Sequence, residues 1–262
     1  MTKKHAVVFL AWGDKYLKEV ERCVKNSPFI ATYAKVLITD QDTVLDGVDV
    51  AFTEVIRATF ETQGLLRKTE MARLLPDTYD AYLFLDSDTI VIEDISLGFE
   101  KAEQVGIAAA VAPHYSLDWF HAFDRYMKLE GVPCLGQLQY NTGVIFFSNS
   151  PAVKAVFQLW MELGLKYRQE YSNDQPFFTL AMEKLGFTPY TLTLCYNYRG
   201  FGDPISGLVR IWHSNGRMPR RINEHPEAWP GRMAWPSRVL VPKRAHGMLY
   251  RLIRTYHRLR DR

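Results

Sequence analysis

The chain has 262 residues, of which 47% are hydrophobic and 23% are charged, so it is long and apolar enough for one large α/β domain or two small ones. Its net charge of +3 does not by itself indicate a nucleic-acid-binding protein. The three cysteines, Cys23, Cys134 and Cys195, are far apart and odd in number, which argues against a disulfide framework or a cysteine zinc site and suits a reducing compartment.

The predicted elements alternate along the chain, beginning with an apolar run at residues 6–11 that is too short for a membrane span and reads as a strand. Since no longer apolar run follows, we expect a cytoplasmic protein. Further strands are predicted at residues 35–40, 48–52, 81–85, 106–113, 141–148, 188–194 and 209–212. Helices are predicted at residues 15–25, 64–75, 97–104, 151–167 and 174–185, with part of 119–129. This order predicts an α/β domain over residues 1–241, with a mostly parallel central sheet and helices on both of its faces.

The strand predicted at residues 81–85 shows no polar alternation, which is typical of a strand buried on both faces. It runs directly into Asp86-Ser87-Asp88, and the carboxyl ends of strands are where open α/β sheets bind ligands. Two aspartates at i and i+2 can bind one hard cation through their oxygens. The alternative is that Asp86 and Asp88 only close a turn.

Five short motifs follow one another along the chain: Leu65-Leu66-Arg67-Lys68, Leu83-Phe84-Leu85-Asp86-Ser87-Asp88, Tyr140-Asn141-Thr142-Gly143, Asn173-Asp174-Gln175-Pro176 and Ile211-Trp212-His213-Ser214-Asn215-Gly216. Each motif is weak alone, but five rarely align by chance. In that order and at those spacings they resemble the nucleotide-sugar glycosyltransferases of the GT-A fold, within the retaining family 8 group, and the resemblance covers residues 6–220.

The resemblance implies a nucleotide-diphosphate sugar donor such as a UDP-sugar, and Mn²⁺ or Mg²⁺ as the cofactor. Asp86 and Asp88 match the metal-binding pair of that family, and His213 matches its third ligand. Imidazole combined with carboxylate oxygens suits manganese better than calcium. The alternative for His213 is a histidine that caps a strand end.

A basic side chain beside the leaving diphosphate would stabilise the charge that develops there. Arg67 and Lys68 both precede the aspartates, but neighbours do not share a helix face. We therefore expect Arg67 to point inward and Lys68 to be a solvated surface charge.

The family also has a lysine in a His-x-x-Gly-x-x-Lys pattern. Here Gly216 matches the glycine, but Pro219 stands at the lysine position, between Arg217 and Arg220. An arginine, with Arg217 as our choice, would have to replace that lysine.

The remaining site residues are also assigned by the resemblance. Asp174 and Gln175 match positions that face the reacting sugar, and we assign them to sugar binding and transition-state support rather than to nucleophilic attack. The alternative for Asp174 is a helix N-cap. Trp12 could instead be core, and Asp40 and Asn141 turn residues. The residues assigned to the nucleotide-sugar are Ala11, Trp12, Gly13, Tyr16, Asp40, Arg67, Ser87, Asn141, Gly216 and Arg217.

The tail, residues 243–262, contains seven Lys or Arg residues and one acidic residue, with apolar residues at helical spacing. Such a basic amphipathic helix can lie on an anionic membrane surface, which would make the protein peripheral there, or it can pack on the domain with a solvated face.

The sequence therefore favours a hexosyltransferase that acts on a glycan, glycolipid or protein acceptor, with retention at the anomeric carbon. A nucleotidyltransferase that makes sugar nucleotides is one alternative, although the residues after the first strand form a poor phosphate-binding loop. A non-catalytic nucleotide- or nucleic-acid-binding module is the other. We expect no nucleic-acid partner, because the basic tail lacks the patch of interleaved aromatic residues on a sheet that nucleic-acid-binding domains show.

Overall fold

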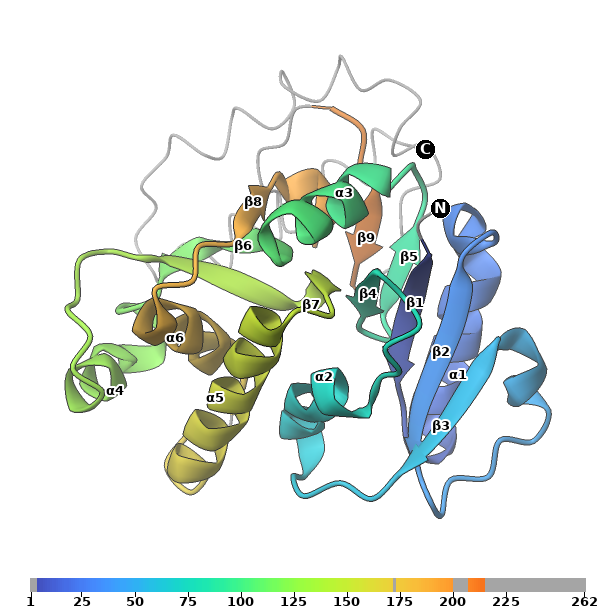
Figure 1. Cartoon of the computed structure of the whole chain (residues 1–262), viewed down its shortest axis with the longest axis horizontal. Helices are drawn as coiled ribbons and strands as arrows, with labels where there is room; N and C mark the ends of the chain where they lie inside the picture. Colours follow the sequence, from blue (N-terminus) through green and yellow to red (C-terminus); the bar gives the residue numbers. More distant parts are fainter. Residues whose placement is uncertain (1–3, 172, 200–206, 215–262) are drawn as a thin grey trace, which may run out of the picture.

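The computed structural model describes residues 4–171, 173–199 and 207–214. Its centre is a seven-stranded sheet in the order β3-β2-β1-β4-β7-β6-β8, accompanied by a two-stranded sheet of β5 and β9 (Figure 1). Neighbouring strands of β3-β2-β1-β4 are parallel, β7 is antiparallel to both β4 and β6, and β8 is parallel to β6. The expected mostly parallel α/β architecture is therefore confirmed.

The strands of the large sheet are β1 (His5–Leu10), β2 (Ala34–Asp40), β3 (Glu54–Ala58), β4 (Ala81–Leu85), β6 (Ile107–Ser116), β7 (Leu138–Ser148) and β8 (Tyr190–Leu192). The longest of them are β6, with 10 residues, and β7, with 11 residues. The small sheet pairs β5 (Thr89–Val91) antiparallel with β9 (Ile211–His213).

Helices cover both faces of the large sheet, which explains why its central strands are apolar without alternation. Along β1, Val7 and Phe9 pack on the face covered by α1 (Gly13–Asn26) and α3 (Ser96–Val105). Ala6 and Val8 pack on the opposite face. That opposite face is covered by α2 (Met71–Leu74), α4 (Asp124–Leu129), α5 (Pro151–Tyr167) and α6 (Gln175–Leu185).

Five 3₁₀ segments complete the described chain: η1 (Pro28–Ile30), η2 (Val48–Ala51), η3 (Gly64–Glu70), η4 (Phe120–Ala122) and η5 (Leu194–Tyr196). Within the described residues, no helix combines the length and the apolar character needed to cross a bilayer. The proposed domain boundary at 241/242 and the amphipathic tail, residues 243–262, lie outside the described residues.

Two predicted elements are wrong. Residues 48–52 were expected to form a strand, but they follow Gly47, whose φ of +82° turns the chain, and they form η2, in which Val50 is 88% exposed. The strand lies later, at β3. Residues 64–75 are not one α-helix but η3 followed by the single turn α2, because three consecutive polar residues, Lys68, Thr69 and Glu70, are all buried. An amphipathic α-helix would expose at least one of them.

The segment between β6 and β7 is fastened to the domain by one buried carboxylate. The side chain of Glu130, at the end of α4, accepts hydrogen bonds of 2.6 Å each from Lys166, Tyr167 and Lys184. Burial alone would raise its pKa, but these three donors outweigh burial and lower the pKa of Glu130 from 4.5 to about 2. The ionised carboxylate thus holds α4 against α5 and α6.

We expect Glu130→Gln to lower the free energy of unfolding by about 2 kcal/mol at neutral pH. Because the folded-state pKa is depressed, this contribution is present above pH 4.5 and is lost as the pH falls towards 2. Urea titrations at neutral and acidic pH should show the deficit shrinking on acidification. Glu170→Gln is the control, since Glu170 pairs with Arg125 in an exposed position and should cost under about 0.5 kcal/mol.

Candidate functional site

Asp86 and Asp88 lie where the central strand β4 ends, and they both close a turn and present their carboxylates to a common point. The turn is closed by backbone and hydroxyl groups, since Thr89 donates to the carbonyl oxygen of Asp86 through its N–H at 3.2 Å and its Oγ1 at 2.8 Å. The Asp86 N–H in turn donates to the Gly143 carbonyl oxygen of β7 at 2.8 Å. Apart from a hydrogen bond between the Asp88 carboxylate and its own N–H, the turn leaves both carboxylates for other partners.

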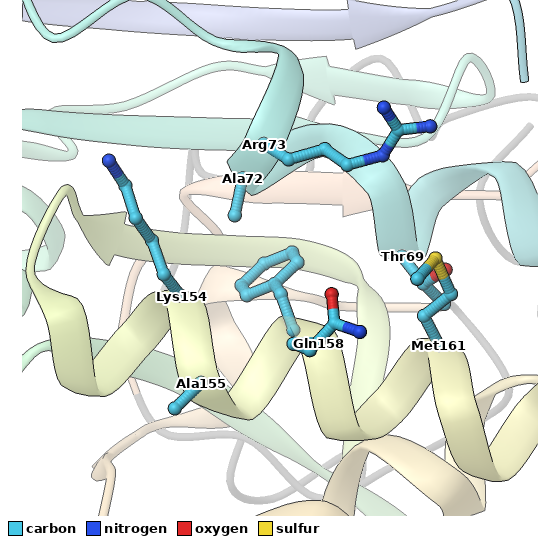
Figure 2. A pocket seen from close by; sticks show the side chains of 8 residues that line it. Thr69, Ala72, Arg73, Lys154, Ala155, Gln158 and Met161 are labelled. Carbon is cyan, nitrogen blue, oxygen red and sulfur yellow. The ribbon is translucent and has the colours of Figure 1, made fainter.

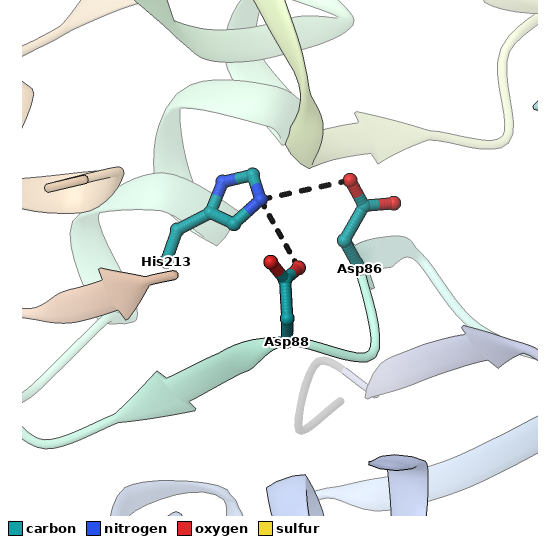
Figure 3. A group of neighbouring side chains, drawn as sticks. All are labelled: Asp86, Asp88 and His213. Carbon is teal, nitrogen blue, oxygen red and sulfur yellow. Dashed lines mark ion pairs between the residues drawn. The ribbon is translucent and has the colours of Figure 1, made fainter. Parts of the chain in front are cut away.

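His213 reaches the same point from the small sheet. His213 is paired with Thr89 in the antiparallel register of β5 and β9, so its imidazole lies beside the turn that carries both aspartates. Its Nε2 is 3.2 Å from Asp88 Oδ1 and 3.7 Å from Asp86 Oδ2 (Figure 3). The ligand atoms of the three residues lie within 4.8 Å of one another.

The residues around this cluster fit a divalent ion. A Cβ atom at Gly143 would lie 2.2 Å from His213 Cε1 and 2.6 Å from Asp86 Oδ2, so only glycine lets β7 pass this close to both ligands. Two carboxylates and one imidazole form a donor set that could hold a divalent metal ion.

The electrostatics keep Asp88 ionised. Burial would raise its pKa, but the hydrogen bond and the charge of His213, together with the charge of Arg199, lower the pKa of Asp88 below its usual value. Arg199 is a cation that the sequence interpretation missed. It follows Tyr198, whose carbonyl oxygen accepts from the His213 N–H at 2.9 Å.

Lys68 is buried at the centre of the site, so its expected role as a solvated surface charge is wrong. Its Nζ lies 3.2 Å from Asp86 Oδ1 and 3.6 Å from Asp174 Oδ2, and 7% of its side chain is exposed. The expectation failed because η3 is enclosed on two sides, so the neighbours Arg67 and Lys68 are directed to two different parts of one site.

Lys68 forms ion pairs with two carboxylates, those of Asp86 and Asp174. Burial would lower the pKa of Lys68, but the charges of Asp174 and Asp86 raise it above its usual value, which keeps the ammonium charged. Burial, reinforced by the charge of Asp86, outweighs the attraction of Lys68 and raises the pKa of Asp174.

Asp174 occupies the N-cap position of α6, but its side chain does not cap the helix. Its side chain makes no capping hydrogen bond, and Asn173 Oδ1 instead accepts from the Gln175 N–H at 3.0 Å. Asp174 Oδ2 accepts from Thr142 Oγ1 at 3.2 Å, and its carbonyl oxygen accepts from Trp160 Nε1 at 2.8 Å. Gln175 begins α6 and is half-buried.

Arg67 lies at the other end of the site, at the carboxyl ends of β1 and β2. It donates to Asp40 Oδ2 at 3.0 Å, and its guanidinium carbon is 4.6 Å from the ring centre of Trp12 and 4.8 Å from that of Phe60. The ring of Trp12 also contacts Tyr16, with 5.2 Å between the ring centres. Among the described contacts Arg67 thus binds Asp40, and it is Lys68 that reaches Asp86.

The turn alternative for Asp40 is confirmed, while its contact with a nucleoside stays a prediction. Its Oδ1 accepts from the Thr43 N–H at 3.0 Å and from Thr43 Oγ1 at 2.5 Å, as a turn residue would. Burial would raise its pKa, but Thr43 and Arg67 together lower the pKa of Asp40. Thr43 Oγ1 also accepts from the Gly13 N–H at 2.9 Å, which fixes the segment Ala11-Trp12-Gly13 beside β2.

Of the other expected site residues, Asn141 lies inside β7 rather than in a turn before it, so its turn alternative is wrong. Its Oδ1 accepts from Asn197 Nδ2 at 2.7 Å, and Asn197 in turn contacts His213 Nδ1 at 2.6 Å. No motif marked Asn197, because only the pairing of distant segments brings it to His213. Ser87 Oγ donates to Glu19 Oε2 at 2.8 Å, while Gly216 and Arg217 lie outside the described residues.

A separate groove of about 290 Å³ lies between α2 and α5 and shares no residue with this cluster (Figure 2). Its cations are already paired, Arg73 with Glu61 and Glu70, and Lys154 with Asp77. We therefore assign the site to the carboxylates and not to the groove. The groove is lined by Thr69, Ala72, Arg73, Lys154, Ala155, Phe157, Gln158 and Met161.

Comparison with solved structures finds this fold in glycosyltransferases. The galactosyltransferase LgtC, in complex with donor and acceptor sugar analogues, superposes with a TM-score of 0.59 at 14% identity, over 92% of this chain and 99% of that one. Mouse xyloside xylosyltransferase 1 gives a TM-score of 0.54 at 17% identity, over 83% of this chain and all of that one. The bifunctional glycosyltransferase WbbM gives 0.53 at 17%, over 83% of this chain and 46% of that one.

These likenesses confirm the expected GT-A fold for the described part of the chain. No protein-family model and no curated protein matches the sequence.

The buried lysine gives a stability prediction. Lys68→Met leaves Asp174 and Asp86 without their cation and should destabilise the protein by about 3–5 kcal/mol. In the double variant with Asp174→Asn the loss should be clearly smaller than the sum of the two single losses, because the unpaired buried charge is then absent. Urea unfolding of the four proteins measures this coupling, and strictly additive losses would contradict the contact.

Proposed function

We propose that the protein is a metal-dependent glycosyltransferase that moves a hexose from a nucleotide-diphosphate sugar, with UDP as the nucleotide, to a glycan, glycolipid or protein acceptor with retention at the anomeric carbon. The observation that carries the proposal is the convergence of Asp86, Asp88 and His213 at the carboxyl end of the central strand, beside the buried pair of Lys68 and Asp174. The GT-A fold supports it.

Asp86, Asp88 and His213 would hold Mn²⁺ or Mg²⁺, which would act as a Lewis acid on the diphosphate leaving group. Lys68 remains charged in this environment and would stabilise negative charge that develops beside Asp86. We propose Arg199 as the further phosphate cation, in place of the lysine that Pro219 replaces, because its charge already reaches Asp88.

The sugar would lie between β7 and the start of α6. Asn141 Oδ1 already accepts two hydrogen bonds, from the Gly143 N–H and from Asn197 Nδ2, so Asn141 offers the sugar its Nδ2 donors. Asp174, with Lys68 and Thr142 holding it in place, and Gln175 are the proposed contacts to sugar hydroxyls.

The nucleoside would occupy the end of the site formed by β1 and β2. Trp12 and Tyr16 provide aromatic surfaces, and Asp40 and Arg67 provide an acceptor and a donor for base or ribose. This aromatic segment after β1 is unlike a glycine-rich phosphate-binding loop, which favours sugar transfer over nucleotidyl transfer. The tail, residues 243–262, is proposed from its sequence alone to hold the enzyme at an anionic membrane that carries the acceptor.

Asp88→Asn tests the metal centre. The substitution removes one charge from the ligand set at constant shape, and we expect the rate of UDP release from the preferred UDP-sugar, with Mn²⁺ present, to fall by about 10³-fold or more. Asp49→Asn, at an exposed position of η2, is the matched control and should leave the rate unchanged. Transfer by Asp88→Asn at a near wild-type rate would end the metal hypothesis.

A thermal-shift screen identifies the donor. With Mn²⁺ present, the UDP-sugar should raise the unfolding midpoint by several degrees at saturation, because the ligand binds only the native state. GDP- and dTDP-sugars and metal-free samples should give smaller shifts. A shift produced instead by a nucleoside triphosphate together with a sugar 1-phosphate would favour a nucleotidyltransferase.

A further inference from the structure

We propose that Asn197 is a positioning residue that fixes the tautomer of His213, so that the Nε2 lone pair faces Asp86 and Asp88. The inference rests on the proposed metal centre and adds to it a residue that binds neither metal nor substrate. It follows from three hydrogen bonds whose directions determine one another.

The first hydrogen bond fixes the orientation of Asn141. The backbone N–H of Gly143 can only donate, and it lies 2.8 Å from Asn141 Oδ1. The amide of Asn141 therefore cannot be rotated by half a turn without placing two donors against each other. Its Oδ1 is a fixed acceptor on the inner part of β7.

The second and third hydrogen bonds follow from the first. Asn197 must present Nδ2 to that acceptor, at 2.7 Å, so its Oδ1 is the atom that lies 2.6 Å from His213 Nδ1. An amide oxygen only accepts, and His213 Nδ1 must therefore carry the hydrogen. When His213 binds a metal as a neutral imidazole, the lone pair is then on Nε2, the ring atom close to Asp88 Oδ1 and Asp86 Oδ2; with no metal bound, a hydrogen on Nε2 can donate to Asp88.

Burial makes this arrangement costly to change. Asn141 and Asn197 are each 5% exposed and His213 is 4% exposed, so a wrongly oriented amide would leave buried donors and acceptors without partners. A metal-binding imidazole whose other nitrogen is fixed by a buried partner is a stronger and better oriented ligand.

The backbone holds Asn197 in place independently of its side chain. The Asn197 N–H donates to the Leu194 carbonyl oxygen at 3.0 Å, and the next N–H, of Tyr198, donates to Ile211 of β9 at 2.9 Å. Substitutions at Asn197 therefore test the side chain without removing the link between η5 and β9.

The test is Mn²⁺ binding by the full chain, measured from the free-ion electron paramagnetic resonance signal with no donor present. We expect Asn197→Leu to weaken binding by about 10–100-fold. Asn197→Asp keeps an acceptor for His213 Nδ1 but no longer donates to Asn141 Oδ1, so it should weaken Mn²⁺ binding less than Asn197→Leu does. Gln139→Leu is the control, because Gln139 is a fully buried amide of β7 whose side chain makes no hydrogen bond within the described residues, and its removal should leave Mn²⁺ binding unchanged.

If Asn197→Leu does not fold, a second measurement still tests the proposal. In the wild-type protein saturated with Mg²⁺, the long-range ¹H–¹⁵N spectrum should show the ring hydrogen of His213 on Nδ1, and a hydrogen on Nε2 would overturn the inference. Equal Mn²⁺ affinity of wild type and folded Asn197→Leu would also overturn it while leaving the metal centre intact. Failure of the wild type itself to bind Mn²⁺ would instead remove the proposed function.

Discussion

The constraint on which the site depends is the concentration of three carboxylates, Asp86, Asp88 and Asp174, at the end of a strand that is buried on both faces. Buried like charges are tolerated only when cations or strong donors accompany them. Lys68 is shared by Asp86 and Asp174, and His213 and Arg199 act on Asp88. Asp86 and Asp88 both lie close to the imidazole of His213, and the three side chains form a cluster that could hold a metal ion.

The fold brings these groups together from distant parts of the chain. Asp86 and Asp88 follow β4, His213 ends β9, and the backbone of Gly143 in β7 passes between them. A single Cβ atom at position 143 would block this close approach. Glycine at this position therefore permits both the spacing of β4, β7 and β9 and the short distance between Asp86 and His213.

Features formed by residues adjacent in the sequence could be predicted from it, whereas contacts between distant segments could not. The strand β4 and the carboxylates after it are encoded by adjacent residues, so the apolar run predicted both. His213 came only from resemblance, and Asn197 carries no local signal because strand pairing alone brings it to His213. Lys68 was wrongly expected to be a surface charge because η3 was treated as a helix with one buried face. Residues 48–52 were wrongly predicted to form a strand, because an apolar run indicates a strand only where its residues are buried, and Val50 is exposed.

The adjacent residues Arg67 and Lys68 connect the two ends of the proposed donor site. Arg67 pairs with Asp40 beside Trp12, and Lys68 lies between Asp86 and Asp174, so one turn of η3 contacts both the nucleoside end and the metal end. The position of η3 is set by Glu70, whose buried carboxylate accepts from the N–H groups of Glu61 at 3.1 Å and Thr62 at 2.8 Å. A donor that extends from base to sugar would run along this turn. Consecutive polar residues of η3 therefore reach both ends of the proposed donor site, with Arg67 at Asp40 and Lys68 at Asp86.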